Sequence, residues 1–529
     1  MSAPVVDTRP FFKPGKPAYH TVPFKVRHLR NMRIAAQLFF LALWVVLFIQ
    51  TRSRGDDPAG LRPDLFLITD PLVAMLTIGS SRVLVPVLAI SAFFIVFTLV
   101  FGRAFCSWIC PLGTLIDGSR HIFRPPAERF SQARHESMQR WKYYMLVFMA
   151  FGALMGAQWV FLFDPLVLMF RGATSIYPVA AGAVPVAWMP KELGVKVFEV
   201  PILPIVLFLG SIGLTAITPR FWCRYLCPLG AFYGLLSKQP LLRRRVKGCD
   251  VCHGREVEKE CVSGCRMGAV PVKPGRTQNH ECIRCFSGAH DCHKDAIQFG
   301  FMKPVIEKSD QSLDLDRRAF LTGGATAMAT APLVALAGYH RGGKNNVIRP
   351  PMVIDEDTFQ DQCIRCAMCV QACPTQTLQL THLEAGIAGF WTPAITPLAG
   401  GCVAGCNACS VACPTDAIPK FSKEEADKWS VKMGTAVLET DRCVSYTEKA
   451  KCLKCVEICP TRAFSIESGP NIPTRPTAVD YNRCVGCGLC ELACSHVVFG
   501  TPALLTFSHG RGQPTSLAEL PTEKLPKLW

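Results

Sequence analysis

The chain has 529 residues, of which 50% are hydrophobic, with 27 cysteines and a formal net charge of +17 at pH 7. Its mean hydropathy of +0.24 is high for a soluble protein. The basic residues flank apolar blocks instead of forming a groove-like patch with aromatics, so the charge favours a lipid environment and no nucleic-acid partner is expected. The odd cysteine count and the repeated cysteine spacing exclude a disulfide framework.

The first part of the chain is expected to be a cytoplasmic segment (1–33) followed by a four-span membrane domain (34–245). Lys and Arg gather before the first apolar stretch, between the second and third, and after the fourth, so the positive-inside rule places the N-terminus and the end of the fourth span in the cytoplasm. A bilayer core of about 30 Å takes about 17–25 helical residues. The stretches that reach or nearly reach this length are Ile34–Gln50, Val83–Phe101, Tyr143–Phe163 and Val200–Thr218.

The membrane domain is an internal duplication of two spans. Asp70-Pro-Leu-Val-Ala-Met-Leu is echoed from Asp164 as Asp-Pro-Leu-Val-Leu-Met-Phe, and a C-x3-C-P-L-G motif closes each unit. Both units begin on the same side, so an axis along the membrane normal is expected to relate them. That symmetry would bring four thiols together as an iron–sulfur or other soft-metal site, unless they only pack or contact a partner. These thiols belong to Cys106, Cys110, Cys223 and Cys227.

Asp70 and Asp164 each precede a proline, which is typical of an N-cap with proline at the first helical position. The alternative is that both carboxylates accept protons from quinol, because acids at this depth are costly and often functional. The spans contain no histidine, so a haem held by two histidines is not expected there.

Residues 246–312 read as a cytoplasmic two-cluster ferredoxin with an inserted loop. The usual exchange pattern assigns one cluster to Cys249, Cys252, Cys261 and Cys292. The other cluster has only Cys265, Cys282 and Cys285, because Gly288 stands where a cysteine is expected. His290 or Asp291 could replace the ligand, or the site could hold [3Fe–4S]. Cys249 also opens a C-x-x-C-H haem signature, but a cytoplasmic site and the ferredoxin count favour the cluster.

Residues 313–343 contain Asp316-Arg-Arg-Ala-Phe-Leu followed by an uncharged Gly/Ala-rich stretch. This predicts an internal twin-arginine export signal, cleaved after Ala337 or retained as a fifth span; a core helix or linker is the alternative. Residues 344–529 are then expected to be periplasmic.

The last part of the chain repeats the C-x2-C-x2-C-x3-C-P spacing, twice undistorted and twice stretched, which is typical of [4Fe–4S] ligands. The sequence does not say whether the clusters pair between adjacent runs or between the first and fourth and the second and third. The four runs are Cys363, Cys366, Cys369, Cys373; Cys402, Cys406, Cys409, Cys413; Cys443, Cys452, Cys455, Cys459; and Cys484, Cys487, Cys490, Cys494.

The predicted fold is therefore a membrane α-helical domain of four to five spans with an internal two-span repeat, plus α+β ferredoxin-like iron–sulfur domains. Six iron–sulfur clusters are expected. All are [4Fe–4S], except that the ferredoxin cluster without a fourth cysteine could be [3Fe–4S]. A seventh cluster is expected if the C-x3-C-P thiols also hold one.

Up to about residue 310 the chain resembles NapH, the quinol-oxidising membrane protein of periplasmic nitrate reductase systems, in its spans, C-x3-C-P motifs and ferredoxin. From Asp314 it resembles NapG, the exported four-cluster partner; MauN and MauM are similar. The resemblance implies a fused quinol dehydrogenase of the bacterial inner membrane. It would draw on the membrane quinone pool, work within a membrane complex and deliver electrons to a periplasmic cytochrome or reductase.

Two alternatives remain open. The family of CcoG, a cupric reductase, also carries membrane C-x3-C-P motifs, which would make their thiols a copper site in a metal-handling assembly factor. Otherwise the chain is an electron-transfer subunit whose quinone site lies on a partner. The four late runs favour electron transfer, because copper reduction has no evident use for them.

Overall fold

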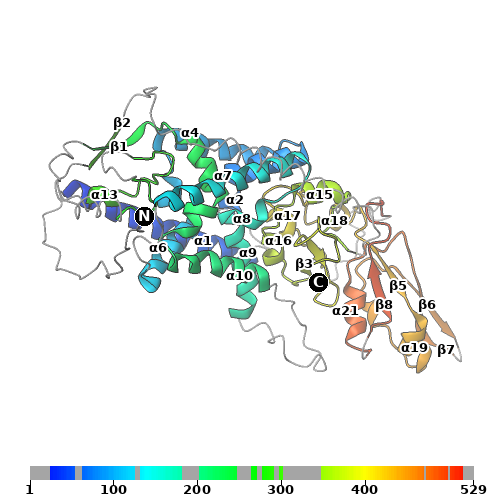
Figure 1. Ribbon diagram of the computed structural model, residues 1–529. Coiled ribbons are helices and arrows are strands. Elements are labelled where there is room, and N and C mark those ends of the chain that lie inside the picture. Colours follow the sequence, from blue (N-terminus) through cyan, green and yellow to red (C-terminus); the bar gives the residue numbers. More distant parts are fainter. Residues whose placement is uncertain are drawn as a thin grey trace, which may run out of the picture.

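The computed structural model describes the chain except for its two ends and several connections (Figure 1). The expected export signal, Asp291, and the ferredoxin cysteines Cys249, Cys252, Cys261 and Cys292 lie outside the described residues. The described ranges are 24–53, 62–124, 132–180, 202–246, 264–270, 277–290, 297–301, 347–469, 472–498 and 501–515.

A helical bundle forms the first part of the described chain, and each half of the duplication contributes a helix that begins at Asp-Pro and another that begins at Cys-Pro. The bundle elements are α1 (Phe24–Ser53), α2 (Leu65–Ile68), α3 (Pro71–Ser81), η1 (Pro86–Ile90), α4 (Ser91–Phe101), α5 (Phe105–Trp108), α6 (Pro111–Phe123), α7 (Gln132–Leu154), α8 (Val160–Phe163), α9 (Pro165–Ala180), α10 (Ile202–Gly213), η3 (Leu214–Ala216), the π-helical turn η4 (Trp222–Leu226) and α11 (Pro228–Leu236).

The expected spans differ from the helices found. Among the described residues, only His28–Thr51 within α1 is long and apolar enough to cross a membrane. The expected span 143–163 is interrupted, because α7 ends at Leu154 and Gly156 turns the chain with a positive φ of 77° before α8 begins. The expected span 83–101 begins at Pro86 instead, since proline has no N–H to continue a helix backwards.

The ferredoxin segment lies at one end of the bundle. Its strands β1 (Leu242–Val246) and β2 (Ile297–Phe301) pair antiparallel, with Leu242 opposite Phe301, and α13 (Ser287–His290) lies beside them. Glu281 of this segment reaches into the bundle and ties the two together.

Residues 347–515 form a second cluster domain of short helices and two-stranded antiparallel sheets, pairing β3 with β4, β5 with β8 and β6 with β7. Short elements leave long loops free to wrap around cofactors. The elements are α15 (Glu356–Gln362), α16 (Met368–Ala372), β3 (Leu378–Leu380), β4 (Pro393–Ile395), α17 (Ala408–Val411), α18 (Glu425–Lys428), β5 (Thr435–Leu438), η7 (Thr440–Arg442), α19 (Val444–Thr447), α20 (Lys454–Ile458), β6 (Phe464–Gly469), β7 (Ile472–Val479), α21 (Leu489–Ser495) and β8 (Leu504–Phe507).

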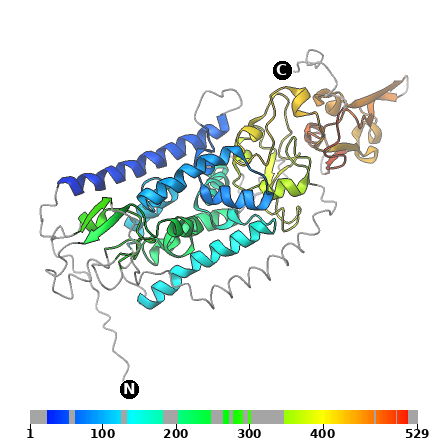
Figure 2. The same ribbon diagram turned by 90° about the horizontal axis from the view of Figure 1, so that it is seen from above.

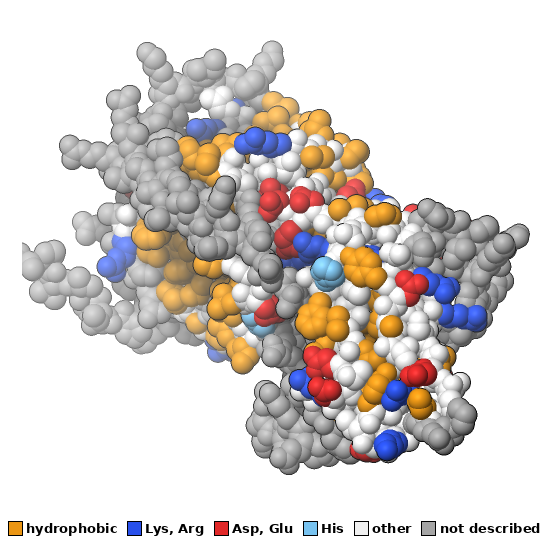
Figure 3. Space-filling view, turned by 90° about the vertical axis from the view of Figure 1, so that its right-hand side faces the viewer, with side chains coloured by type: hydrophobic (Ala, Val, Ile, Leu, Met, Phe, Trp, Pro, Cys, Tyr) orange, Lys and Arg blue, Asp and Glu red, His pale blue; other side chains and the backbone are white. Residues whose placement is uncertain are grey.

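The two cysteine-rich regions lie at opposite ends of the bundle in both views (Figures 1 and 2). The second cluster domain packs directly on the bundle, with α15 against α3 and α16 against α1 and α9. Ser80 donates a hydrogen bond to the carbonyl of Asp361 at 2.6 Å. Trp391 and Cys366 share one buried hydrophobic cluster with Phe161 of the bundle. The outer end of this domain mixes hydrophobic, acidic and basic side chains (Figure 3).

Candidate metal centres

Each C-x3-C-P-L-G motif places its second cysteine at the N-terminus of a helix. Cys110 caps α6 and accepts a hydrogen bond at Sγ from the N–H of Gly113 at 3.4 Å; Cys227 caps α11 and accepts one from Gly230 at 3.2 Å. The helix N-terminus favours negative charge, so both sites suit a thiolate. A Cβ on either glycine would stand 2.8 Å from a neighbour, the carbonyl oxygen of Cys106 or the guanidinium of Arg103. The contact at Gly113 is with backbone, so the first motif needs glycine there, whereas the contact at Gly230 is with the end of a side chain.

The structure brings the four motif thiols together. Burial raises the pKa of Cys110, and the thiolates of Cys106 and Cys223 raise it further; the pKa of Cys227 is affected in the same way by all three others. Among the described residues, no three His, Cys, Asp or Glu side chains are close enough to bind one metal ion directly. A cubane holds its thiolates further apart, because each binds a different iron atom.

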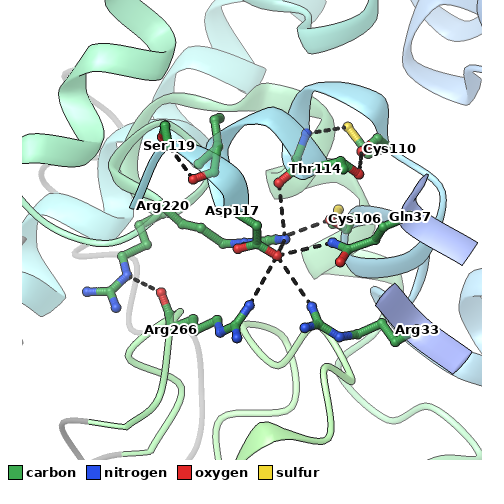
Figure 4. Close-up of polar contacts among 12 residues, drawn as sticks. Arg33, Gln37, Cys106, Cys110, Thr114, Asp117, Ser119, Arg220 and Arg266 are labelled. Atoms are coloured by element: carbon green, nitrogen blue, oxygen red, sulfur yellow. Dashed lines mark hydrogen bonds and ion pairs between the residues drawn. The ribbon is translucent and has the colours of Figure 1, made fainter. Parts of the chain in front are cut away.

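A buried carboxylate, Asp117 of α6, lies beside these thiols and gathers cations (Figure 4). It accepts hydrogen bonds at 2.8 Å from Nε and Nη2 of Arg220, and Arg33 and Arg266 lie 3.3 Å from its Oδ2. These guanidinium groups hold the pKa of Asp117 well below its usual range in spite of burial. Arg220 also donates to the carbonyl of Cys106 at 3.1 Å.

A second buried carboxylate, Glu281, comes from the ferredoxin segment. It accepts hydrogen bonds from Arg103 at 2.8 Å, from Lys142 and from the hydroxyl of Tyr143 at 3.0 Å. Lys142 and Arg103 lower the pKa of Glu281 to about 2 against the effect of burial. Its side chain is 1% exposed, so this is an interior ion pair.

Asp117 and Glu281 carry fewer negative charges than the cations around the thiols carry positive ones. This surplus of positive charge suits a negatively charged group bound at the thiols. An iron–sulfur cluster held by thiolates carries such a charge. The five cations are Arg33, Arg103, Lys142, Arg220 and Arg266.

The ferredoxin thiols lie next to the motif thiols. Cys265, Cys282 and Cys285 pack on the same buried group of Met267, Ala269 and Ile283 as Cys106 and Cys223. The structure therefore juxtaposes the two predicted sites.

The position that lacks a cysteine lies in α13. Gly288 has only Ile297 near its missing Cβ, and His290 lies 3.0 Å from Nη1 of Arg30 in α1. The assignment of His290 as a ligand stays a prediction.

The two Asp-Pro carboxylates meet in the bundle. Both act as N-caps through Oδ1: Asp70 accepts from Leu72 at 2.8 Å, and Asp164 from Leu166 at 2.9 Å. Both are fully buried, and a hydrogen bond links the two carboxyl groups. Burial raises the pKa of both, that of Asp164 to about 6, and the charge of Asp164 raises that of Asp70 further. The pair can therefore hold and release a proton near neutral pH.

Tyr233 of α11 links this pair to the thiols. Its hydroxyl is buried with no partner among the described residues. Burial raises its pKa, and so do the charges of Asp70, Cys106, Cys110 and Asp164. Tyr233 therefore lies within electrostatic reach of both sites.

In the second cluster domain, the two undistorted cysteine runs share one backbone pattern. Arg365 and Ala367 in the first run have φ of 53° and 66°, and Gly486 and Gly488 in the fourth have 74° and 79°. Residues in this left-handed region turn the loop sharply around the space between the cysteines. The loop from Cys282 has the same pattern at Arg284 and Phe286, although its third cysteine is missing.

The thiols group by exchange of the fourth cysteine between adjacent runs. Cys363, Cys366, Cys369 and Cys413 line one cavity. Cys373 instead lies near the second run, as its effect on the pKa values of Cys402 and Cys409 indicates. The same exchange holds for the other pair, giving one group of Cys443, Cys452, Cys455 and Cys494 and another of Cys484, Cys487, Cys490 and Cys459. The pairing that the sequence left open is thus between adjacent runs.

The four groups form a series that begins at the bundle. Cys366 belongs to the hydrophobic cluster of the bundle. The N–H of Cys402 donates to the carbonyl of Cys487 at 2.8 Å, which joins the first pair to the second. Cys455 and Cys490 pack in the outer core, and Cys452 is partly exposed there.

Several of these side chains were not identified from the sequence. Arg103 and Arg220 precede the two motifs at equivalent positions, so the duplication contained a signal for them. Asp117, Glu281 and Tyr233 have no equivalent in the other half, and only the folded structure reveals them.

The fold and the thiol groups define an iron–sulfur electron-transfer protein, and comparison with known sequences agrees. Residues 83–127 and 200–248, each with one C-x3-C-P motif, match one family described as a 4Fe-4S binding domain, and residues 358–379 match another family of the same description. Residues 401–463 and 450–498 match 4Fe-4S dicluster domains. The match over residues 401–463 covers the second and third cysteine runs, whereas in the structure these two runs belong to different pairs. The two differ because a sequence match follows the spacing of cysteines along the chain.

The chain belongs to the family of ferredoxin-type proteins that includes MauM and NapG. It is 33% identical over 204 residues to the methylamine utilization ferredoxin-type protein MauM of Methylorubrum extorquens, covering 36% of this chain and 87% of that protein. It is 33% identical to the ferredoxin-type protein NapG of Escherichia coli over 31% of this chain and 73% of that protein. An uncharacterized protein of Methanocaldococcus jannaschii is 26% identical over 39% of this chain. No solved structure matches.

Proposed function

We propose that the chain oxidises quinol in the bacterial inner membrane and passes the electrons through its clusters to a periplasmic acceptor. The observation that carries the proposal is the buried Asp70–Asp164 pair. Tyr233 lies within electrostatic reach of both this pair and the motif thiols, and the two helices that the aspartates cap pack against the second cluster domain. Quinol oxidation releases two electrons and two protons. A carboxylate pair whose pKa values are raised is suited to accept these protons one at a time near neutral pH, releasing the first before it takes the second.

The second cluster domain supports onward transfer. When bound, its clusters accept electrons one at a time. The ligand exchange gives a series from Cys366 at the bundle to Cys452 at the outer end, where a cytochrome or reductase would receive the electrons. The orientation, with the N-terminus and ferredoxin segment cytoplasmic and residues 344–529 periplasmic, is part of the proposal. It is supported by the basic flanks and by the location of the two cysteine-rich regions at opposite ends of the bundle.

The proposal also addresses how electrons reach the periplasmic side. The Asp pair lies in the helical bundle, and α9, which begins after Asp164, packs against α16 of the second domain. Quinol bound near this pair would deliver electrons directly to the second domain. Electrons that reach the second domain in this way need not cross the full width of the membrane.

The test is anaerobic reduction of the purified full chain by a reduced quinol analogue, followed by EPR, with iron and sulfide counted on the same sample. Fast reduction of clusters, lost in Asp70→Asn and Asp164→Asn variants, is the expected result. Clusters that remain oxidised with quinol but reduce with dithionite would contradict the proposal. They would instead favour a quinone site on a partner, or copper chemistry at the motif thiols.

A further inference from the structure

Arg171 of α9 is buried at the contact between the bundle and the second cluster domain. It has no exposed surface, and its Nε, Nη1 and Nη2 atoms have no hydrogen-bond acceptor among the described residues. Its guanidinium lies over the ring of Trp391 at 4.2 Å and near that of Phe161 at 5.6 Å. Aromatic faces attract a cation but do not replace the water or the anion that a buried charge needs.

Arg171 also lies close to a predicted cluster ligand, because its helix α9 packs against α16, which follows Cys366. Burial and the neighbouring Arg365 lower the pKa of Arg171 to about 9, whereas the thiolate of Cys366 acts in the opposite direction. Arg171 therefore remains a cation at neutral pH. Cys366 shares the buried cluster with Trp391 and Phe161, so the thiol and the guanidinium belong to one packed interface.

Arg365 provides the contrast within the same interface. Its Nη1 donates to the carbonyl of Gln158 and its Nη2 to that of Ala388 at 2.6 Å, while its guanidinium lies over Phe161. Neutral carbonyls accept hydrogen bonds from both of its terminal nitrogens and hold the cysteine loop on the bundle. The described residues around Arg171 offer it no comparable acceptor.

We infer that Arg171 is the buried counter-cation of the cluster held by Cys363, Cys366, Cys369 and Cys413, and that it raises the reduction potential of that cluster. Reduction adds one electron and one negative charge, and a cation in a low-dielectric interior stabilises the more negative state. Because Arg171 belongs to the bundle, docking of the second domain makes its nearest cluster the better electron acceptor. The inference rests on the cluster assignment of the proposed function, but not on quinol oxidation.

The experiment is an anaerobic redox titration of the full-length protein in detergent, followed by EPR, for wild type, Arg171→Gln and Arg171→Lys. Arg171→Gln is expected to shift the one-electron reduction equilibrium of a single cluster at least tenfold, which lowers its midpoint by at least about 59 mV. Arg171→Lys keeps the charge and is expected to retain most of the wild-type potential. Arg475→Gln is the control, because Arg475 is a partly exposed arginine of β7 paired with Glu467.

A second variant tests the same inference if Arg171→Gln does not fold. Ser175 lies one turn further along α9, is buried, and its Oγ has no partner among the described residues. Ser175→Asp would place a carboxylate beside Arg171 and offset its charge while keeping the arginine. The same lowering of potential is expected. Unshifted midpoints in both variants, with full iron content, would overturn this inference alone. Wild-type protein without iron in the second domain would overturn it together with the proposed function.

Discussion

Asp117 and Gly234 occupy the same position in the two halves of the internal duplication, at equal distance after the second cysteine of each motif. In the first half, Asp117 binds Arg220. In the second half, glycine leaves space that the hydroxyl of Tyr143 fills, and the acid for Arg103 is Glu281 of the ferredoxin segment. The two arginines are thus paired in equivalent ways by acids of different origin, and the ferredoxin segment completes the bundle.

Glu281→Gln is expected to destabilise the protein by about 3–5 kcal/mol, because it leaves Arg103 and Lys142 buried without their anion. Thermal unfolding in detergent measures the effect. Since the pKa of Glu281 is lowered in the folded state, its contribution is present above its ordinary value and lost as pH falls towards about 2. Glu467→Gln, at a more exposed pair, should change stability by less than about 1 kcal/mol. Equal effects of the two substitutions would contradict this account of Glu281.

Gly113→Ala is expected to disrupt the motif site, because the new Cβ would stand 2.8 Å from the carbonyl oxygen of Cys106. Gly118 is the matched control, since it lies in the same helix and a Cβ there meets nothing within 4 Å. Gly118→Ala should be neutral or stabilise by up to about 1 kcal/mol through helix propensity. The test measures the iron content and the melting temperature of both variants. Equal loss of iron in Gly118→Ala would show that the contact at Gly113 does not cause the disruption.

Quinol-driven cluster reduction is expected to accelerate as pH rises through about 6, because Asp164 must be deprotonated to accept a proton and burial raises its pKa to about 6. Asp164→Asn keeps an oxygen for the helix cap but cannot accept the proton, so the rate should fall about 100-fold and lose this pH dependence. Asp164→Ala should in addition lower stability by about 1 kcal/mol through loss of the cap. A pH profile of Asp164→Asn that matches wild type would rule out this role.

Double substitutions test the exchange of the fourth cysteine. If Cys373 serves the second run, Cys373→Ala with Cys402→Ala removes ligands from one cluster and should cost about four iron atoms. Cys363→Ala with Cys373→Ala affects two clusters and should cost about eight. The reverse order of iron loss would mean that each run holds its own cluster. Iron and sulfide analysis of purified protein provides the counts.

The sequence predicted the structure best where ligand chemistry or helix capping fixes the spacing of residues along the chain. The cysteine runs and the echo of Asp70 at Asp164 were visible without a structure, because ligand geometry and helix capping act over a few residues. The helix ends were less accessible: hydropathy continues through residues 155–159, but Gly156 breaks the helix there. Local apolar character does not encode where a backbone turns.

The partners of the buried charges could not be predicted, because they come from segments distant in the chain. Glu281 meets Arg103 and Lys142 only after the ferredoxin segment folds onto the bundle, and Trp391 reaches Arg171 only after the second domain docks. Hydrophobic pattern gives no indication of which arginine will face which acid.

The exchange of cysteines between adjacent runs has a consequence for biogenesis. The cavity lined by Cys363, Cys366 and Cys369 also needs Cys413, which follows it by a full run, so the first cluster has no complete ligand set until the second loop is in place. The second cluster depends on Cys373 in return. Insertion of iron and sulfide should therefore proceed in pairs, and partly matured molecules should accumulate with an even number of clusters in this domain.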